Sequence, residues 1–259
     1  MAKPSILCLH GEGCSAEILA IQTRALRLAL PQFEFHFVDA PFASPAGPGI
    51  LPFFEPPYYS WIKQDSASPG ADARVVRSFL EKPLALGNFN GVLAFSQGCR
   101  VATGLLRDAV LKKGLEFGVF LSGTYPPLCL DGDCATCYLF RDQGLQLGGA
   151  VTTKQPLRWD HGDLVAVPSL HIHASRDPFL RYNRLLLGRC FDADTSWLIE
   201  IEGDHQIPNN RGDVDALRLA LLEIWEELKS VDDLRFHGVK DCKVNGSIVV
   251  RELEVVDSN

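Results

Sequence analysis

The stretch GVLAFSQGCR, residues 91–100, decides which fold is expected for this chain. It begins with apolar residues typical of a buried strand and runs directly into Ser96. Between Ala94 and Gly98 it follows the strand-to-helix pattern G-x-S-x-G, with alanine in place of the first glycine. Small residues are needed there because the turn is tight and brings backbone against backbone. A serine that merely caps a helix is the commoner case, so this stretch alone leaves both interpretations open.

Short apolar runs alternate with segments of helical spacing along the rest of the chain. Besides residues 91–96, strands are expected at residues 5–10, 33–41, 117–123, 168–177 and 196–203. Helices are expected at residues 15–30, 71–80, 98–111, 182–190 and 214–231. Strands that alternate with helices predict a single α/β domain over residues 1–259, with a mostly parallel sheet of about six strands and helices on both faces.

Three segments interrupt this alternation. Residues 42–61 are rich in proline and aromatic residues, which predicts an ordered, extended excursion. Residues 128–167 form a long insertion between two expected strands. Long excursions in a compact domain tend to be lids or binding loops, although a structural cover over the sheet end is the alternative. The tail, residues 235–259, has no predicted place on the sheet, but Asn245–Gly246 suits a tight turn between short strands.

Composition and charge narrow the class of protein. The chain has 259 residues, of which 46% are hydrophobic, enough for a large core. Its net charge is −7 and it has no basic tract, which argues against a nucleic-acid partner. The N-terminus lacks the pattern of a secretory signal, and no apolar run approaches the ~20 residues that span a bilayer. We therefore expect a soluble cytoplasmic protein with no membrane partner.

The eight cysteines are scattered rather than arranged as a disulfide framework, which fits reduced thiols. Cys134 and Cys137 have the spacing of metal ligands, but no second pair or suitably spaced histidines complete a site. Plain loop cysteines are the better interpretation. No glycine-rich phosphate loop is present either. The sequence therefore predicts neither a metal nor a cofactor.

The partners that a nucleophilic serine needs follow Ser96 in the chain. A serine hydroxyl attacks well only when a base takes its proton. On a sheet of this kind, serine, acid and histidine occur in that order, each at a strand end. Asp177 follows an expected strand and precedes a proline, and His205 follows the last expected strand. We therefore predict a catalytic triad of Ser96, Asp177 and His205.

Other residues are weaker candidates for these roles. His171 and His173 alternate within an expected strand and share a face, so packing or local bonding suits them better. Asp192 and Asp194 replace Asp177 only if the strand boundary is misplaced. Ser122 ends another expected strand but lacks the G-x-S-x-G pattern. It is expected in the floor of the pocket. The remaining histidines lack an acid and serine context: His36, His161 and His237.

The chemistry also needs N–H groups that receive a developing oxyanion. The usual donors are the residue after the nucleophile and a residue in the loop after the first strand. Here they are predicted to be the backbone N–H groups of Gln97 and Glu12. An ordinary turn is the alternative interpretation of Gly11 and Gly13. The Glu12 carboxylate is expected to point to solvent or bond within its loop.

Six blocks of the chain resemble, in order, the signature blocks of the fungal FSH-type serine hydrolases, a group that includes ovarian-cancer-gene-2-like hydrolases. The blocks are ILCLHGEGCSAEI, FEFHFVDAPF, FFEPPYYSW, GVLAFSQGCRVA, SRDPF and GDHQIP, within residues 6 to about 228. The resemblance implies an α/β-hydrolase fold with Ser96 as nucleophile, His205 as base and Asp177 as its orienting acid. One departure is Asp204, where the last block usually reads glycine before histidine.

The resemblance also implies a function. Members such as the lovastatin-pathway thioesterase release a polyketide acid from the acyl carrier protein of a synthase, while others are carboxylesterases. We expect a thioesterase that acts in trans on a carrier-bound polyketide or fatty acyl chain. A carboxylesterase of small oxygen esters and a non-catalytic binding protein are the rivals. The expected pocket residues are Phe53, Phe54, Tyr58, Tyr59, Trp61 and Ser122. Oligomeric state is not predicted.

Overall fold

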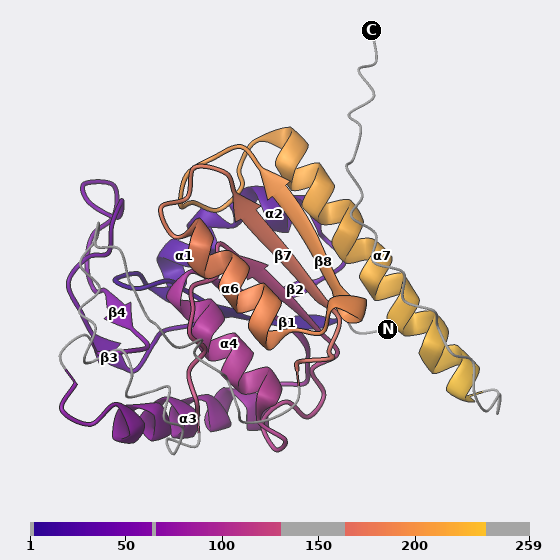
Figure 1. Ribbon diagram of the computed structural model, residues 1–259, viewed down its shortest axis with the longest axis horizontal. Helices are drawn as coiled ribbons and strands as arrows, with labels where there is room; N and C mark the ends of the chain where they lie inside the picture. The colour runs from indigo at the N-terminus through magenta and orange to yellow at the C-terminus, as the bar shows by residue number, and fades with distance from the viewer. Residues whose placement is uncertain (1–2, 64–65, 131–163, 237–259) are drawn as a thin grey trace, which may run out of the picture.

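A computed structural model describes residues 3–63, 66–130 and 164–236 of the chain. Its centre is a six-stranded parallel sheet in the order β2-β1-β5-β6-β7-β8 (Figure 1). The strands are β1 (Ser5–Leu9), β2 (Glu34–Val38), β5 (Phe89–Phe95), β6 (Phe117–Leu121), β7 (Ser169–Ala174) and β8 (Ser196–Ile201). The predicted α/β class and the number of strands in the main sheet are therefore confirmed. Five of the strands lie within a predicted run, and β5 begins two residues before its predicted run.

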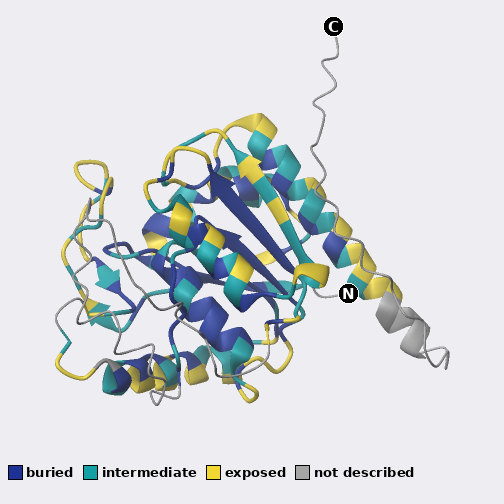
Figure 2. Ribbon diagram, viewed as in Figure 1, coloured by how far each residue is buried: buried dark blue, intermediate teal, exposed yellow. Residues whose placement is uncertain are grey.

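Helices cover both faces of the sheet, as the alternating pattern predicted (Figure 1). They are α1 (Ala16–Gln22), α2 (Arg24–Ala29), α3 (Pro69–Leu86), α4 (Gln97–Arg107), α6 (Leu180–Cys190) and α7 (Arg211–Phe236), with a short 3₁₀ turn η1 (Ala193–Thr195) before β8. Residues of α1, α2 and α7 pack with one face of the sheet, and residues of α3, α4 and α6 with the other. The central strands are accordingly buried on both sides (Figure 2).

Three helices, α3, α6 and α7, run beyond their predicted bounds. Two other predicted helices are divided or cut short for local reasons. The helix expected over residues 15–30 is divided at Thr23, whose hydroxyl donates a hydrogen bond to the Leu19 carbonyl. A threonine bonded in this way competes with the helical backbone pattern and bends the helix. Helix α4 ends at Arg107 rather than Leu111, because the Asp108 carboxylate accepts from the backbone N–H groups of Val110 and Leu111 and turns the chain.

The excursion at residues 42–61 is tied to the body of the domain. Its ends pair as β3 (Phe42–Ala43) and β4 (Tyr59–Ser60), a two-stranded antiparallel sheet. A further bridge joins Tyr59 to Cys14, on the loop that follows β1: Tyr59 N–H donates to the Cys14 carbonyl at 2.7 Å. The excursion is therefore ordered, as its composition predicted, and it lies against the first loop of the sheet.

Some expectations lie outside the described residues. They concern the metal-like spacing of Cys134 and Cys137, the histidine at 161, most of the insertion at 128–167, and the Asn245–Gly246 turn in the tail. Within the part of the chain that the structure describes, no helix is both long and apolar enough to cross a membrane. The same residues contain no group of three or more His, Cys, Asp or Glu side chains that could hold a metal ion.

Candidate active site

Ser96 lies on a strained turn between β5 and α4. Its backbone has φ 51° and ψ −116°, a conformation that side-chain-bearing residues rarely adopt. Although it occupies the position before the helix, its hydroxyl makes no capping hydrogen bond. Ser15, in contrast, caps α1 by accepting from the Ile18 N–H. The strained backbone directs the Ser96 hydroxyl away from its own helix, so the capping interpretation of this serine is wrong.

The hydroxyl of Ser96 instead faces His205, and the imidazole of His205 faces Asp177. The distance from Ser96 Oγ to His205 Nε2 is 2.8 Å, and that from His205 Nδ1 to Asp177 Oδ2 is 2.9 Å. A carboxylate only accepts hydrogen bonds, so Nδ1 carries the proton and Nε2 is left to accept from the serine hydroxyl. The three side chains come from loops after β5, β7 and β8, at the carboxyl edge of the sheet.

The surroundings hold this chain of hydrogen bonds in place. The Asp177 side chain is fully buried, and its second oxygen accepts from the Phe179 N–H at 2.7 Å. The imidazole of His205 lies between the rings of Phe95 and Phe179, with centroid distances of 5.1 and 4.9 Å. These contacts fix the orientation of the histidine while leaving its Nε2 beside the serine.

Asp204 points away from this chain of hydrogen bonds. Its carboxylate pairs with Arg176 at 3.5 Å, and both side chains are well exposed to solvent. An exposed pair of this kind contributes little to stability. The residue that departs from the usual glycine before His205 is therefore engaged on the surface.

The competing residues lie elsewhere. His171 stacks on Phe120 and its Nε2 lies 3.1 Å from the Ser169 hydroxyl, a packed core environment. Burial lowers the pKa of His171 well below its ordinary value and that of His173 to about 4. Asp192 caps η1 by accepting from the Asp194 N–H. None of these side chains is bonded to Ser96.

The two segments expected to carry oxyanion donors pack against each other. Gln97 is the first residue of α4, which leaves its N–H without a partner in the helical pattern. A Cβ on Gly98 would lie 2.4 Å from the Leu9 carbonyl oxygen, and one on Gly11 would lie 3.3 Å from the Ser96 Cβ. Only glycine lets the loop after β1 approach the turn so closely. Glu12, the other predicted donor, is partly buried on this loop.

The loop after β1 is braced by His10, a role that the sequence did not reveal. Its ring is fully buried, and Ala40 N–H donates to Nε2 at 3.0 Å. The proton therefore sits on Nδ1, which lies 2.6 Å from the Gly11 carbonyl. Burial lowers the pKa of His10, which favours this neutral form.

The six residues predicted to line the pocket have different surroundings. Trp61 is fully buried in the core, and Tyr58 is buried in a small cluster with Cys14, Ile18 and Ile50. Phe53 is 78% exposed, and Phe54 and Tyr59 are partly buried. Ser122 is buried directly after β6 and has φ 47°, so the neighbouring strands β5 and β6 are each followed by a serine with positive φ.

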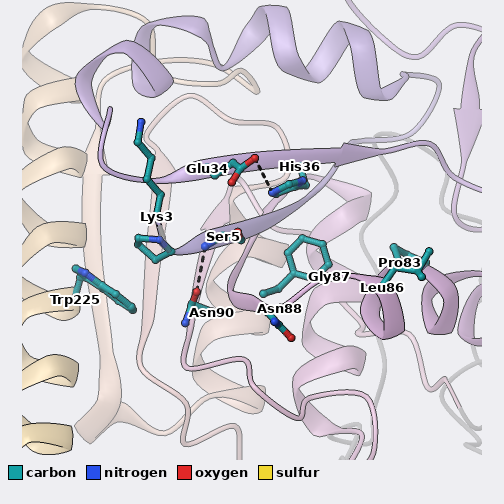
Figure 3. A pocket seen from close by; sticks show the side chains of 12 residues that line it. Lys3, Ser5, Glu34, His36, Pro83, Leu86, Gly87, Asn88, Asn90 and Trp225 are labelled. Atoms are coloured by element: carbon teal, nitrogen blue, oxygen red, sulfur yellow. Dashed lines mark hydrogen bonds and ion pairs between the residues drawn. The ribbon is translucent and has the colours of Figure 1, made fainter. Parts of the chain in front are cut away.

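A separate cavity of about 620 Å³ lies at the opposite, amino-terminal edge of the sheet. Figure 3 shows Trp225 on one side and the Glu34–His36 pair on the other, with Ser5 N–H donating to Asn90 between them. The cavity is lined by none of the predicted pocket residues. It is therefore remote from the serine and its partners.

Comparisons with known proteins identify the family. A family described as serine hydrolase (FSH1) matches residues 1–217. The chain is 32% identical to the thioesterase FSL2 of Gibberella zeae, over 88% of this chain and 94% of that protein. It is 30% identical to the esterase FUS5 of Gibberella moniliformis, over 99% of this chain and 96% of that one. It is also 30% identical to the dihydromonacolin L-[lovastatin nonaketide synthase] thioesterase of Aspergillus terreus, over 82% of this chain and 89% of that protein.

Solved structures show the same fold. A carboxylesterase from Mesorhizobium loti superposes with a TM-score of 0.54 at 15% identity, over 86% of this chain and 90% of that one. The esterase PE8 gives a TM-score of 0.51 at 19% identity, over 86% and 93%. The family match covers most of the chain and includes Ser96, Asp177 and His205. The chain is therefore a serine hydrolase and belongs to the FSH1 family.

Proposed function

We propose that this chain is a thioesterase that releases an acyl chain from a carrier protein by means of Ser96, His205 and Asp177. The proposal rests above all on the continuous hydrogen bonds from Ser96 Oγ to His205 and on to Asp177. The names of the relatives favour a thioester as substrate. Two of them are called thioesterases, and one of these names mentions a nonaketide synthase. A polyketide or fatty acyl chain is the substrate class that this resemblance favours.

The reaction proceeds in two halves. Ser96 Oγ attacks the thioester carbonyl while its proton passes to His205 Nε2, and Asp177 stabilises the imidazolium that forms. The backbone N–H groups of Gln97 and Glu12 receive the oxyanion. The carbon–sulfur bond then breaks, and the thiolate takes the proton from His205.

Water completes the cycle. His205 removes a proton from a water molecule, whose oxygen attacks the acyl group held on Ser96. The carbon–oxygen bond to Ser96 breaks, the proton returns from His205 to the serine oxygen, and the free acid leaves. No metal or cofactor takes part in any of these steps.

The excursion at residues 42–61 supports a role in holding the acyl chain. Its bridge from Tyr59 to Cys14 places it beside the loop that carries Glu12. Phe53, Phe54 and Tyr59 retain exposed surface on this excursion, which suits contact with an apolar ligand.

We propose a cytoplasmic location, which the free thiols of Cys8 and Cys99 in the core support.

A carboxylesterase is the second candidate, favoured by the name of the relative that is aligned over nearly the whole chain. The same three side chains serve an oxygen ester, so only the preference for the leaving group distinguishes the two activities. The test compares one acyl group offered as an N-acetylcysteamine thioester and as an oxygen ester. A thioester preference that rises with chain length supports the thioesterase, whereas equal or faster cleavage of short oxygen esters supports the esterase.

A further inference from the structure

The side chain of Gln97 binds the backbone of the excursion. Its Oε1 accepts from the Trp61 N–H at 2.8 Å and from the Ile62 N–H at 3.3 Å. The hydroxyl of Ser60 lies 3.0 Å from the same oxygen and shares its proton with the Ile62 carbonyl. Two backbone N–H groups directed at one atom identify that atom as the oxygen rather than the nitrogen of the amide. Gln97 is buried, so each of these bonds is made out of contact with bulk water.

Trp61 continues the connection to the loop after β1. Its indole N–H donates to the His10 carbonyl at 2.9 Å, and its ring lies 5.4 Å from the imidazole of His10. The other side of the indole meets Phe79 on α3, and no part of Trp61 is exposed. One buried residue therefore joins the Gln97 side chain to His10, the residue that follows β1.

A second set of bonds attaches the same loop to the excursion further along. Cys14 and Tyr59 exchange backbone hydrogen bonds, and Gly47 N–H donates to the Gly13 carbonyl at 2.9 Å. A Cβ on Gly13 would lie 2.0 Å from Gly47 N, so the two backbones are in direct contact. The loop from His10 to Cys14 is thus held at both ends by the excursion, which is itself held by Gln97.

We infer that the carboxamide of Gln97 is a positioning group, which sets the loop bearing the Glu12 N–H at its proper distance from the Gln97 N–H. The inference rests on the proposed function, because it concerns the two proposed oxyanion donors. One donor is on the Gln97 backbone, and the side chain of the same residue braces the segment that carries the other. Substitution of the side chain leaves the first N–H in place and loosens the second.

Loss of this brace affects the transition state more than the bound substrate. An oxyanion is fully formed only in the tetrahedral intermediate, so a misplaced donor lowers kcat and leaves KM nearly unchanged. Removal of one oxyanion donor typically costs about 100- to 1,000-fold in kcat. A donor that is displaced rather than removed is expected to cost less, about 10- to 100-fold.

The test uses three variants of the full chain with one acyl thioester. Gln97→Leu removes the acceptor, Gln97→Glu restores an acceptor oxygen, and Asn90→Leu is the matched control. Asn90 also accepts from a backbone N–H, that of Ser5 at 3.1 Å, but at the opposite edge of the sheet. Rates are expressed per folded molecule, with thermal unfolding measured for each variant. Affinity for an acyl trifluoromethyl ketone, which forms a tetrahedral adduct with the serine, is measured in parallel.

We expect Gln97→Leu to lose about 10- to 100-fold in kcat with KM changed less than about threefold. Its affinity for the trifluoromethyl ketone should fall in proportion, and Gln97→Glu should recover most of the rate. Asn90→Leu should lose stability with kcat intact. If Gln97→Leu does not fold, Trp61→Phe tests the same connection, because it keeps an aromatic ring but lacks the N–H to His10; its kcat should fall with KM nearly unchanged.

Two results would overturn the inference: a wild-type kcat in folded Gln97→Leu or, where that variant does not fold, in Trp61→Phe; or an equal loss of kcat in Asn90→Leu. Failure of the proposed function has a different signature. In that case Ser96→Ala retains the activity, whatever the rate of the Gln97 variants. If Ser96→Ala is inactive and Gln97→Leu is fully active, only the positioning role is wrong.

Discussion

The Nε2 atom of His205 lies 2.8 Å from the hydroxyl oxygen of Ser96, although 109 residues separate the two along the chain. The parallel sheet brings them together, because β5, which precedes Ser96, and β8, which precedes His205, have their carboxyl ends at the same edge. The strained backbone of Ser96 also contributes, since its hydroxyl makes no bond to the helix that follows and lies beside the histidine. The roles proposed for these two side chains can be tested by substitution.

Replacement of Ser96 by alanine should abolish turnover without unfolding the protein. The change removes the attacking oxygen, so we expect kcat to fall by at least about 10⁴-fold. The unfolding midpoint should be unchanged or slightly higher, because the hydroxyl caps no helix and its loss leaves only His205 Nε2 unpaired. Steady-state kinetics and urea unfolding measure both quantities. Retained turnover in this variant contradicts the assignment of the nucleophile.

Replacement of Asp177 by asparagine should leave the geometry and remove the correct histidine tautomer. The asparagine amide can donate to His205 Nδ1, which moves the imidazole proton to Nε2 and blocks acceptance from Ser96. We expect a loss of about 10⁴-fold in kcat with KM little changed. A variant that retains more than about a tenth of wild-type kcat would assign the orienting role to another acid.

Replacement of Gly98 by alanine should disturb both stability and rate. Its new Cβ would lie 2.4 Å from the Leu9 carbonyl oxygen and 2.6 Å from that of His10, and backbone atoms must move to relieve this. We expect a loss of about 1–3 kcal/mol in the free energy of unfolding and more than about tenfold in kcat/KM.

Gly188→Ala is the control for this substitution. A Cβ at this exposed position on α6 meets no atom within 4 Å. Alanine is a better helix former than glycine, so this variant should gain up to about 1 kcal/mol and keep its activity. Equal losses of activity in the two variants would show that close packing around Gly98 is not the cause.

The buried histidine at position 173 should make the protein sensitive to acid. Burial lowers its pKa to about 4, against an ordinary value near 6.5, so the unfolded chain binds more protons between these two pH values. The contribution of His173 to the free energy of unfolding is therefore fully present above about pH 6.5 and is lost as the pH falls towards 4. The contribution at stake is about 2–3 kcal/mol.

His173→Gln removes this titration while keeping a polar side chain. Urea unfolding at pH 7 and pH 4.5 should show a smaller loss of stability in the variant than in the wild-type protein. We expect a difference of this sign because the wild-type histidine takes up a proton when the protein unfolds in acid. An identical loss in both proteins would show that other groups determine the acid sensitivity.

The sequence was sufficient for the features that depend on short patterns. The turn at Ser96 follows from the small residues Ala94 and Gly98, and the positions of Asp177 and His205 follow from strand ends in a parallel sheet. The break at Thr23 was not predictable, because the same residue is tolerated within helices when its hydroxyl does not bond to the preceding turn. Whether that bond forms is decided by the packing of the finished fold.

Contacts between segments far apart in the sequence could not be predicted, for a different reason. The sequence predicted a backbone role for Gln97 and a pocket role for Trp61, but gave no sign that the two residues are hydrogen-bonded. A polar side chain at a helix start usually faces solvent, and only the fold shows that this one is buried against the excursion. The pocket role of Trp61 stays a prediction, although its side chain lies wholly within the core.

Fluorophosphonate labelling followed by peptide mapping tests whether Ser96 is an activated nucleophile. The reagent reacts with an activated serine, and trypsin is expected to release Ser96 within residues 78–100. We expect one label, on Ser96, which is absent in Ser96→Ala and strongly reduced in His205→Ala. Equal labelling of the wild-type protein and Ser96→Ala, or a label on a different serine, would contradict it.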